Sequence, residues 1–157
     1  MINTTRLQKA AEDALRVVFY EKCKRISDID VCDHTEEIFD NEFEGVAVWC
    51  DVNRRALSWF CGDPAFIISY SHDLDEGSID LFLGDKCTDL DAAMDAADAF
   101  NCDRVWHIEQ LDDFLMLQAT FTLESPDELE AELISKLKAL EYVDFVKAIK
   151  PVVAYFE

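Results

Sequence analysis

The stretch from Thr88 to Pro151 constrains the fold more than any other part of the chain. It predicts, in direct succession, a helix capped by Thr88, two strands joined by a turn, and a second helix that begins at Ser125. The start of this helix is marked by Ser125 at the N-cap and Pro126 at the first helical position. Glu128 then closes a capping box with Ser125. Such a unit packs its helices against an antiparallel hairpin, and it therefore predicts an α+β domain.

Three helices are expected in total. The first, residues 5–22, starts with a capping box formed by Thr5 and Gln8. The middle helix spans residues 88–101, and the third begins at Ser125. Apolar residues at helical spacing predict the buried stripe of the third helix, which comprises Leu129, Leu133, Ile134, Leu137 and Leu140.

Alternation of apolar and polar residues predicts the strands. They are expected at residues 45–52, 57–62, 65–71, 78–83, 105–110 and 114–123. The first two are expected to pair as a hairpin across a polar turn at residues 53–55. A further short strand is expected at residues 29–31, and a helical turn capped by Thr35 at residues 35–39.

The order of these elements predicts helices laid on an antiparallel sheet. Residues 1–157 are expected to form a single domain, because a chain of this length buries a core without disulfides or metals. Half of the residues are hydrophobic, and only 4 Gly and 3 Pro interrupt them. That composition is typical of a folded globule.

The chain is strongly acidic, with 14 Lys and Arg against 34 Asp and Glu and a formal net charge of -20. Such a field repels phosphate backbones and anionic membranes, so neither a nucleic acid nor a membrane partner is expected. From Ile26 to Asn53 there are acidic residues and no Lys or Arg. This segment is either a solvated surface that keeps the protein soluble or a complement to a basic partner.

The N-terminal residues show no signal-peptide pattern, and no apolar run approaches the ~20 residues of a membrane helix. A cytoplasmic location is therefore expected.

The six cysteines are scattered, without any Cys-x-x-Cys spacing, so neither a zinc knuckle nor a redox centre is expected. Cys50 and Cys61 lie in strand-like runs and are expected to be small buried hydrophobic residues.

Trp49, Trp59 and Trp106 all lie in strand-like runs and are the candidate partner-binding residues. Rings exposed on a sheet face would anchor an interface. In the alternative interpretation, the three rings cover the second face of the sheet beneath a helix.

The histidines His34, His72 and His107 lie in different segments and are expected to be surface residues. Cys32 stands too close to His34 in the sequence for the two to act as a nucleophile and its base. Catalytic motifs for hydrolysis, phosphate binding and dinucleotide binding are absent from the sequence. No catalytic residue and no cofactor are expected, and the chain is not expected to be an enzyme.

Asp73, Asp75, Gly77 and Asp80 are similar in spacing to a calcium loop. The match fails because Gly comes one residue early and the closing Glu is missing. A solvated hairpin loop is the preferred interpretation, and no metal site is expected.

The middle helix, residues 88–101, ends in Ala-Phe-Asn, the next strand ends in a Leu-Asp-Asp turn at 111–113, and the last strand leads into Ser-Pro-Asp-Glu at 125–128. These features resemble the C-terminal half of YbjN-type domains, which share the type III secretion chaperone-like fold. The resemblance covers residues 88–140 in sequence and, through the order α-β-β-β-α-β-β-α, most of the chain in architecture. Residues 26–71 contain more strand-like sequence than that fold requires. The resemblance implies a non-enzymatic protein that often dimerises and binds another polypeptide.

Three hypotheses about function follow. The first is a chaperone-like binding or regulatory domain, with a homodimer as its expected assembly, that recognises a segment of a partner protein. The second is an acidic DNA mimic or an inhibitor of a basic protein, based on the net charge. The third is a small metal-binding protein or an enzyme that uses Asp73, Asp75 or the histidines.

Overall fold

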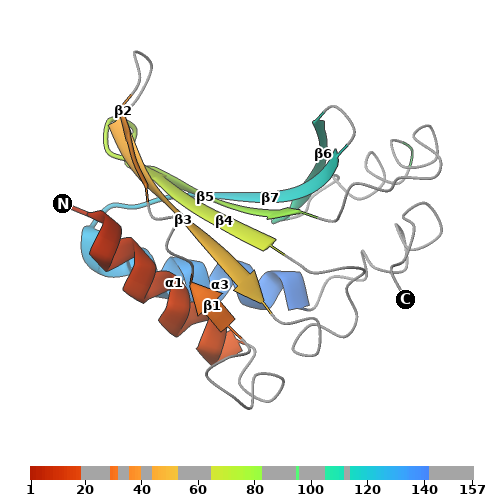
Figure 1. The fold of residues 1–157 in the computed structure, drawn as a ribbon, viewed down its shortest axis with the longest axis horizontal. Coiled ribbons are helices and arrows are strands. Elements are labelled where there is room, and N and C mark those ends of the chain that lie inside the picture. The colour runs from red at the N-terminus through yellow and green to blue at the C-terminus, as the bar shows by residue number, and fades with distance from the viewer. Residues whose placement is uncertain are drawn as a thin grey trace.

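The computed structural model describes residues 1–18, 29–31, 36–39, 44–52, 65–82, 95, 105–111 and 114–141. Within these residues the chain has an α+β fold. Helices α1 (Thr4–Val18) and α3 (Leu129–Glu141) pack together on one face of an antiparallel sheet (Figure 1). The expected fold class, helices on an antiparallel sheet, is thereby confirmed.

The described sheet has seven strands, and all paired neighbours are antiparallel. The strands are β1 (Ile29–Val31), β2 (Glu36–Phe39), β3 (Glu44–Val52), β4 (Ala65–Ser71), β5 (Glu76–Phe82), β6 (His107–Leu111) and β7 (Phe114–Thr122). Their order across the sheet is β1-β3-β4-β5-β7-β6, and β2 also pairs with β3. β3, β4, β5 and β7 therefore form the four-stranded centre.

The edge of the sheet beside β3 differs in part from expectation. The short strand at residues 29–31 is confirmed as β1, whereas the helical turn expected at residues 35–39 is wrong because residues 36–39 form β2. A single helical turn forms few hydrogen bonds for the residues that it orders. Pairing of residues 36–39 along β3 supplies more of them.

Both sides of β3 are occupied by strands. β4 pairs with it on one side, and on the other side β2 pairs with its beginning and β1 with its end. The expected hairpin partner of β3, residues 57–62, lies outside the described residues. The expected strands at 65–71, 78–83, 105–110 and 114–123 are found with small shifts as β4, β5, β6 and β7.

The sheet face toward the helices is apolar, since successive strand residues point to opposite faces. The row Val48, Ile68, Ile79 and Ala119 crosses the four central strands, and all four side chains are fully buried. The helices complete the core with Leu7, Ala10, Ala11, Ala14 and Leu15 from α1 and Leu129, Leu133, Leu137 and Leu140 from α3. The stripe expected for the third helix is confirmed, with Ile134 partly buried at its margin.

The start of α1 differs from the expected one. Asn3 is the cap, since its Oδ1 accepts a hydrogen bond from Arg6 N at 2.9 Å and its carbonyl accepts one from Leu7 N at 2.9 Å. Thr5, the expected cap, already lies within the helix. Ile2 and Leu7 occupy the two positions of a hydrophobic staple, and both are buried in the core. Burial of Ile2 thus sets the first residue of the helix.

The start of the third helix is confirmed. Ser125 is the N-cap, and its Oγ accepts from Asp127 N at 3.3 Å. The first turn, η2 (Pro126–Glu128), is a 3-10 helix that continues into α3. The Glu128 carboxylate accepts from Glu124 N at 3.2 Å, one residue before the cap that a standard capping box engages.

Gly77 in β5 allows a close approach of β7. Its partner across the ladder is Phe121, and a Cβ atom at Gly77 would overlap the Phe121 ring. Only glycine leaves room for an aromatic side chain directly over the strand backbone.

Some expected elements lie outside the described residues. Of the middle helix, residues 88–101, only Asp95 is described, and it is helical. The same holds for any continuation of the third helix beyond Glu141. Among the helices that the structure describes, none is long and apolar enough to cross a membrane.

Candidate binding face

The sheet face opposite α1 and α3, which we call the outer face, is largely polar. Its central row contains Trp49, Ile67, Asp80, Gln118 and His107, one residue each from β3, β4, β5, β7 and β6. All five side chains are half-buried. The next row, toward the β4–β5 turn, contains Ala47, Ser69, Ser78 and Thr120. Strand alternation thus places hydroxyl, amide, carboxylate and imidazole groups together on this face.

Hydrogen bonds join five side chains of the outer face into a chain across four strands. Ser69 Oγ lies 2.7 Å from Ser78 Oγ, and Ser78 Oγ donates to Asp80 Oδ2 at 3.3 Å. Gln118 Nε2 donates to Asp80 Oδ1 at 2.7 Å. His107 Nε2 lies 3.2 Å from Gln118 Oε1. The Asp80 carboxylate is therefore the centre of this hydrogen-bond network.

The direction of each bond follows from the number of hydrogens available. Ser78 has one hydroxyl hydrogen, which it donates to Asp80, so Ser69 donates to Ser78. The amide oxygen of Gln118 only accepts, so His107 Nε2 carries the hydrogen of that bond. On both sides of Asp80, the hydrogen bonds of the network donate toward its carboxylate. A serine nucleophile would bond to the imidazole of its base. Among these five hydrogen-bonded side chains, no hydroxyl contacts an imidazole.

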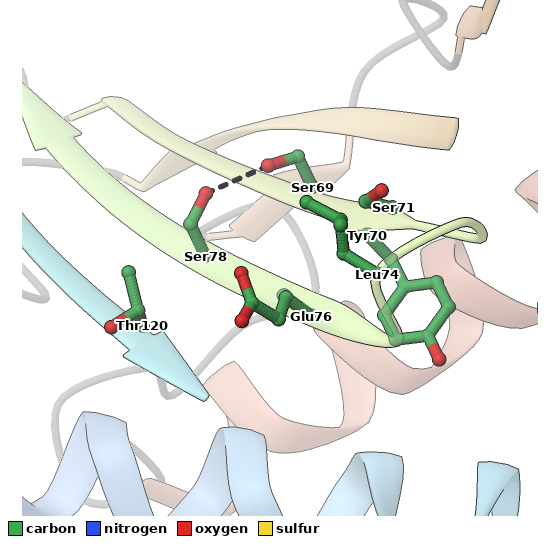
Figure 2. Close-up of a pocket in the computed structure, with 8 residues that line it drawn as sticks. Ser69, Tyr70, Ser71, Leu74, Glu76, Ser78 and Thr120 are labelled. Atoms are coloured by element: carbon green, nitrogen blue, oxygen red, sulfur yellow. Dashed lines mark hydrogen bonds between the residues drawn. The ribbon is translucent and has the colours of Figure 1, made fainter. Parts of the chain in front are cut away.

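A hollow of about 230 Å³ lies beside this hydrogen-bond network, between β4, β5 and β7 (Figure 2). It is lined by Ser69, Tyr70, Ser71, Leu74, Glu76, Gly77, Ser78 and Thr120. Figure 2 shows the Ser69 and Ser78 hydroxyls meeting across β4 and β5, while the Tyr70 ring points away from them. Glu76 and Thr120 are exposed, and Leu74 is 62% exposed. The hollow therefore combines hydroxyls, one carboxylate and one exposed apolar side chain.

The turn between β4 and β5, which borders the hollow, is tied to distant parts of the fold. His72 Nε2 donates to the carbonyl oxygen of Ile2 at 2.7 Å. Asp73 Oδ2 accepts from Glu44 N at 2.9 Å. Asp75 has a positive φ of 52°, which aspartate adopts more readily than most residues. These bonds hold the rim of the hollow in one position.

Tyr70 links the same turn to the core. Its ring is buried, and its hydroxyl donates to Asp75 Oδ1 at 3.0 Å. Burial raises the pKa of Tyr70 to about 12, and the hydrogen bond to Asp75 and the negative charge of that carboxylate contribute to the rise. Tyr70 is thus neutral at physiological pH and serves as a donor.

The residues that resemble a calcium loop have other roles in the structure. Asp73 and Asp75 bind groups of the turn, whereas Asp80 belongs to the outer row. Of the histidines, His72 and His107 make separate hydrogen bonds, and His34 lies outside the described residues. In the described part of the chain, no group of three His, Cys, Asp or Glu side chains is arranged to hold a metal ion.

The candidate tryptophans that the structure describes differ in burial. Trp49 is half-buried in the central row of the outer face. Trp106 is 0% exposed, and its Nε1 donates to the carbonyl of Lys136 in α3 at 2.8 Å, which agrees with the alternative interpretation of a ring beneath a helix. A buried indole needs such a partner, and helix α3 supplies it. Trp59 lies outside the described residues.

Cys50 is fully buried in the core, as expected of a small hydrophobic residue, whereas Cys61 lies outside the described residues.

The sequence points to Asp80 only as part of a calcium-like spacing and to His107 only as a surface histidine. It does not single out the other members of the hydrogen-bonded network, Ser69, Ser78 and Gln118. Ser69, Ser78, Asp80 and Gln118 do alternate with apolar residues in their strands, which was the available signal. Their contacts also depend on the pairing of β5 with β7, which no local pattern specifies.

Comparisons of the chain with protein-family models, with curated proteins and with solved structures found no match. Function is therefore inferred from the outer face itself.

Proposed function

We propose that this chain is a non-enzymatic, chaperone-like binding domain that presents its outer face to a segment of a partner polypeptide. The observation that carries the proposal is the row of half-buried side chains that crosses five strands opposite the helices, in which Trp49 and Ile67 are followed by the polar residues Asp80, Gln118 and His107. Side chains already ordered by hydrogen bonds lose less conformational entropy when a partner binds. Trp49 adds an aromatic group of the kind enriched in interfaces.

The chemistry of the outer face favours recognition over catalysis. Ser69 and Ser78 donate toward Asp80, so their hydroxyls are oriented by a carboxylate without an adjacent imidazole base. Gln118 separates His107 from that carboxylate. Such a network holds side chains in fixed positions, which is what a binding surface requires.

The resemblance to YbjN-type domains supports the same function. The described order of α1, the β3-β4-β5 meander, the β6-β7 hairpin and α3 is compatible with that fold, with β1 and β2 as added strands. In this proposal residues 88–101 supply the middle helix. The protein acts in the cytoplasm as a homodimer and needs neither a cofactor nor a metal.

The proposal predicts that a partner polypeptide contacts the outer face and avoids the helix layer. A photo-crosslinking phenylalanine derivative replaces Thr120, which is exposed on β7, and in a matched control it replaces Ser135, which is exposed on α3. After illumination in cell extract, mass spectrometry should identify a defined partner segment attached at position 120 and none at position 135. Equal adducts from both positions, or none from position 120, would contradict the proposal.

A second candidate is an inhibitor of a basic protein, and the charge of the sheet favours it. The seven described strands contain acidic residues but no Lys or Arg. An inhibitor of this kind competes with duplex DNA for a basic protein and loses affinity in 0.5 M salt, where the Debye length is roughly 4 Å. Binding that persists unchanged in that salt excludes this candidate.

A further inference from the structure

We infer that the hollow beside Glu76 receives a cationic side chain of the partner segment, with arginine the best fit. The inference rests on the proposed function, because it names the partner chemistry that the outer face recognises. Three features of the hollow carry it: the direction of its hydroxyl hydrogens, its charge, and the exposed apolar side chain at its rim.

Two hydroxyl groups of the hollow, those of Ser69 and Ser78, offer a ligand lone pairs and no hydrogens. Ser69 donates its hydrogen to Ser78, and Ser78 donates to Asp80, so these two hydrogens are used within the outer face. The hydroxyls of Ser71 and Thr120, which also line the hollow, can both donate and accept. The remaining capacity of the Ser69 and Ser78 oxygens is to accept. A ligand that matches them must be rich in donors. A guanidinium group has five N–H donors and no acceptor, and an ammonium group has three donors.

The charge of the hollow has the sign that such a ligand requires. The Glu76 carboxylate lines the hollow and is exposed, and within the described structure it forms no hydrogen bond or ion pair. The described Lys and Arg side chains lie on the helices. Arg6, Lys9 and Arg16 of α1 pair with acidic groups, and Lys136 and Lys138 lie on α3. No described strand carries a cation that would neutralise Glu76.

The rim of the hollow suits the aliphatic part of a long cationic side chain. Leu74 is 62% exposed on the β4–β5 turn and lines the hollow together with Glu76. Lysine and arginine place their methylene groups on apolar surface while the charged end stays with polar partners. The turn is held in position by its bonds to Ile2 and Glu44, so the site exists before the partner arrives.

The probe for this site is a blocked hexapeptide in which arginine alternates with threonine. Its matched controls are the same peptide with citrulline, which is uncharged, or with lysine in place of arginine. Isotope-labelled protein is titrated with each peptide at low salt and followed by NMR. The arginine peptide should shift the amide signals of Ser69, Ser78 and Thr120, the lysine peptide should bind more weakly at the same signals, and the citrulline peptide should leave them unchanged.

Two protein variants separate the site from the general acidity of the chain. Glu76→Gln removes the carboxylate of the hollow and should weaken the arginine peptide about fivefold, as loss of an exposed ion pair does. Glu132→Gln removes the same charge from α3, on the other side of the sheet, and should change affinity less than twofold. Equal losses in both variants, equal binding of the citrulline peptide, or no binding of the arginine peptide would overturn the inference.

The two proposals fail in different ways. If crosslinking at position 120 captures a partner segment without Arg or Lys, the binding function holds and the cation site is wrong. If no partner is captured while the arginine peptide still binds at Glu76, the cation site holds and the binding function is wrong.

Discussion

At the residue scale, a few side-chain bonds hold the β4–β5 turn and β6 in place. Tyr70 of β4 donates to Asp75 in the turn, and His72 in the turn donates to the carbonyl of Ile2. Trp106 connects the start of β6 to α3. Each of these groups combines a large buried or half-buried ring with one polar atom that finds a partner.

Tyr70 makes part of the stability depend on pH. A tyrosine whose pKa is higher in the folded chain, about 12, than its usual value of 10.0 holds its proton more tightly when folded. This contribution is complete below pH 10 and is lost as the pH rises through 12. The wild-type free energy of unfolding should therefore fall by about 2 kcal/mol relative to Tyr70→Phe between pH 9 and 12. Urea unfolding followed by tryptophan fluorescence measures it, and parallel curves for the two proteins would count against it.

At the element scale, both the local sequence pattern and tertiary contacts determine at which residue a helix begins. The signal at Ser125 is local, since cap, proline and acidic residues stand together, and the third helix starts where that signal places it. The signal at Thr5 is equally local, yet α1 starts two residues earlier, at the cap Asn3. Ile2 is drawn into the core beside Leu7, and this burial outweighs the weaker capping preference.

Two substitutions test which residue caps α1. Asn3→Ala removes the Oδ1 that accepts from Arg6 N and should lower the free energy of unfolding by about 1 kcal/mol. Thr5→Ala, at an exposed position inside the helix, should leave it unchanged or slightly higher, because alanine favours helix more than threonine. Chemical denaturation of both variants and the wild type provides the comparison. A larger loss for Thr5→Ala would place the cap at the residue that the sequence pattern indicates.

At the scale of the whole molecule, the charges are separated between layers. The described cations lie in α1 and α3, and the described strands carry acidic residues without Lys or Arg. The chain as a whole has a net charge of -20. Ion pairs within the helices, such as Lys9 with Asp13, offset little of this repulsion because they are exposed. Self-repulsion therefore opposes the compact state.

Added salt should stabilise the protein. Raising NaCl from about 0.02 M to 0.5 M shortens the Debye length from about 20 Å to about 4 Å and screens the repulsion between carboxylates. The melting temperature, measured by calorimetry, should rise by several degrees at pH 7.5. The rise should be smaller at pH 5.5, closer to the isoelectric point near 4.3. A melting temperature that falls with salt at pH 7.5 would show that attractive ion pairs dominate.

The sequence by itself determined the fold class, the strands of the sheet centre and the buried stripe of the third helix, because strand alternation and helical spacing are local patterns. It also predicted that β6 and β7 are joined by a turn, but it did not determine the order of the other strands across the sheet. The tertiary structure decided that Trp106 is buried under α3 and that Asp80 and Gln118, 38 residues apart, share a hydrogen bond. Such contacts depend on strand order, which is set by how the apolar faces of all the elements pack at once. The candidate site lies on the outer face, where that order brings polar residues from four strands together.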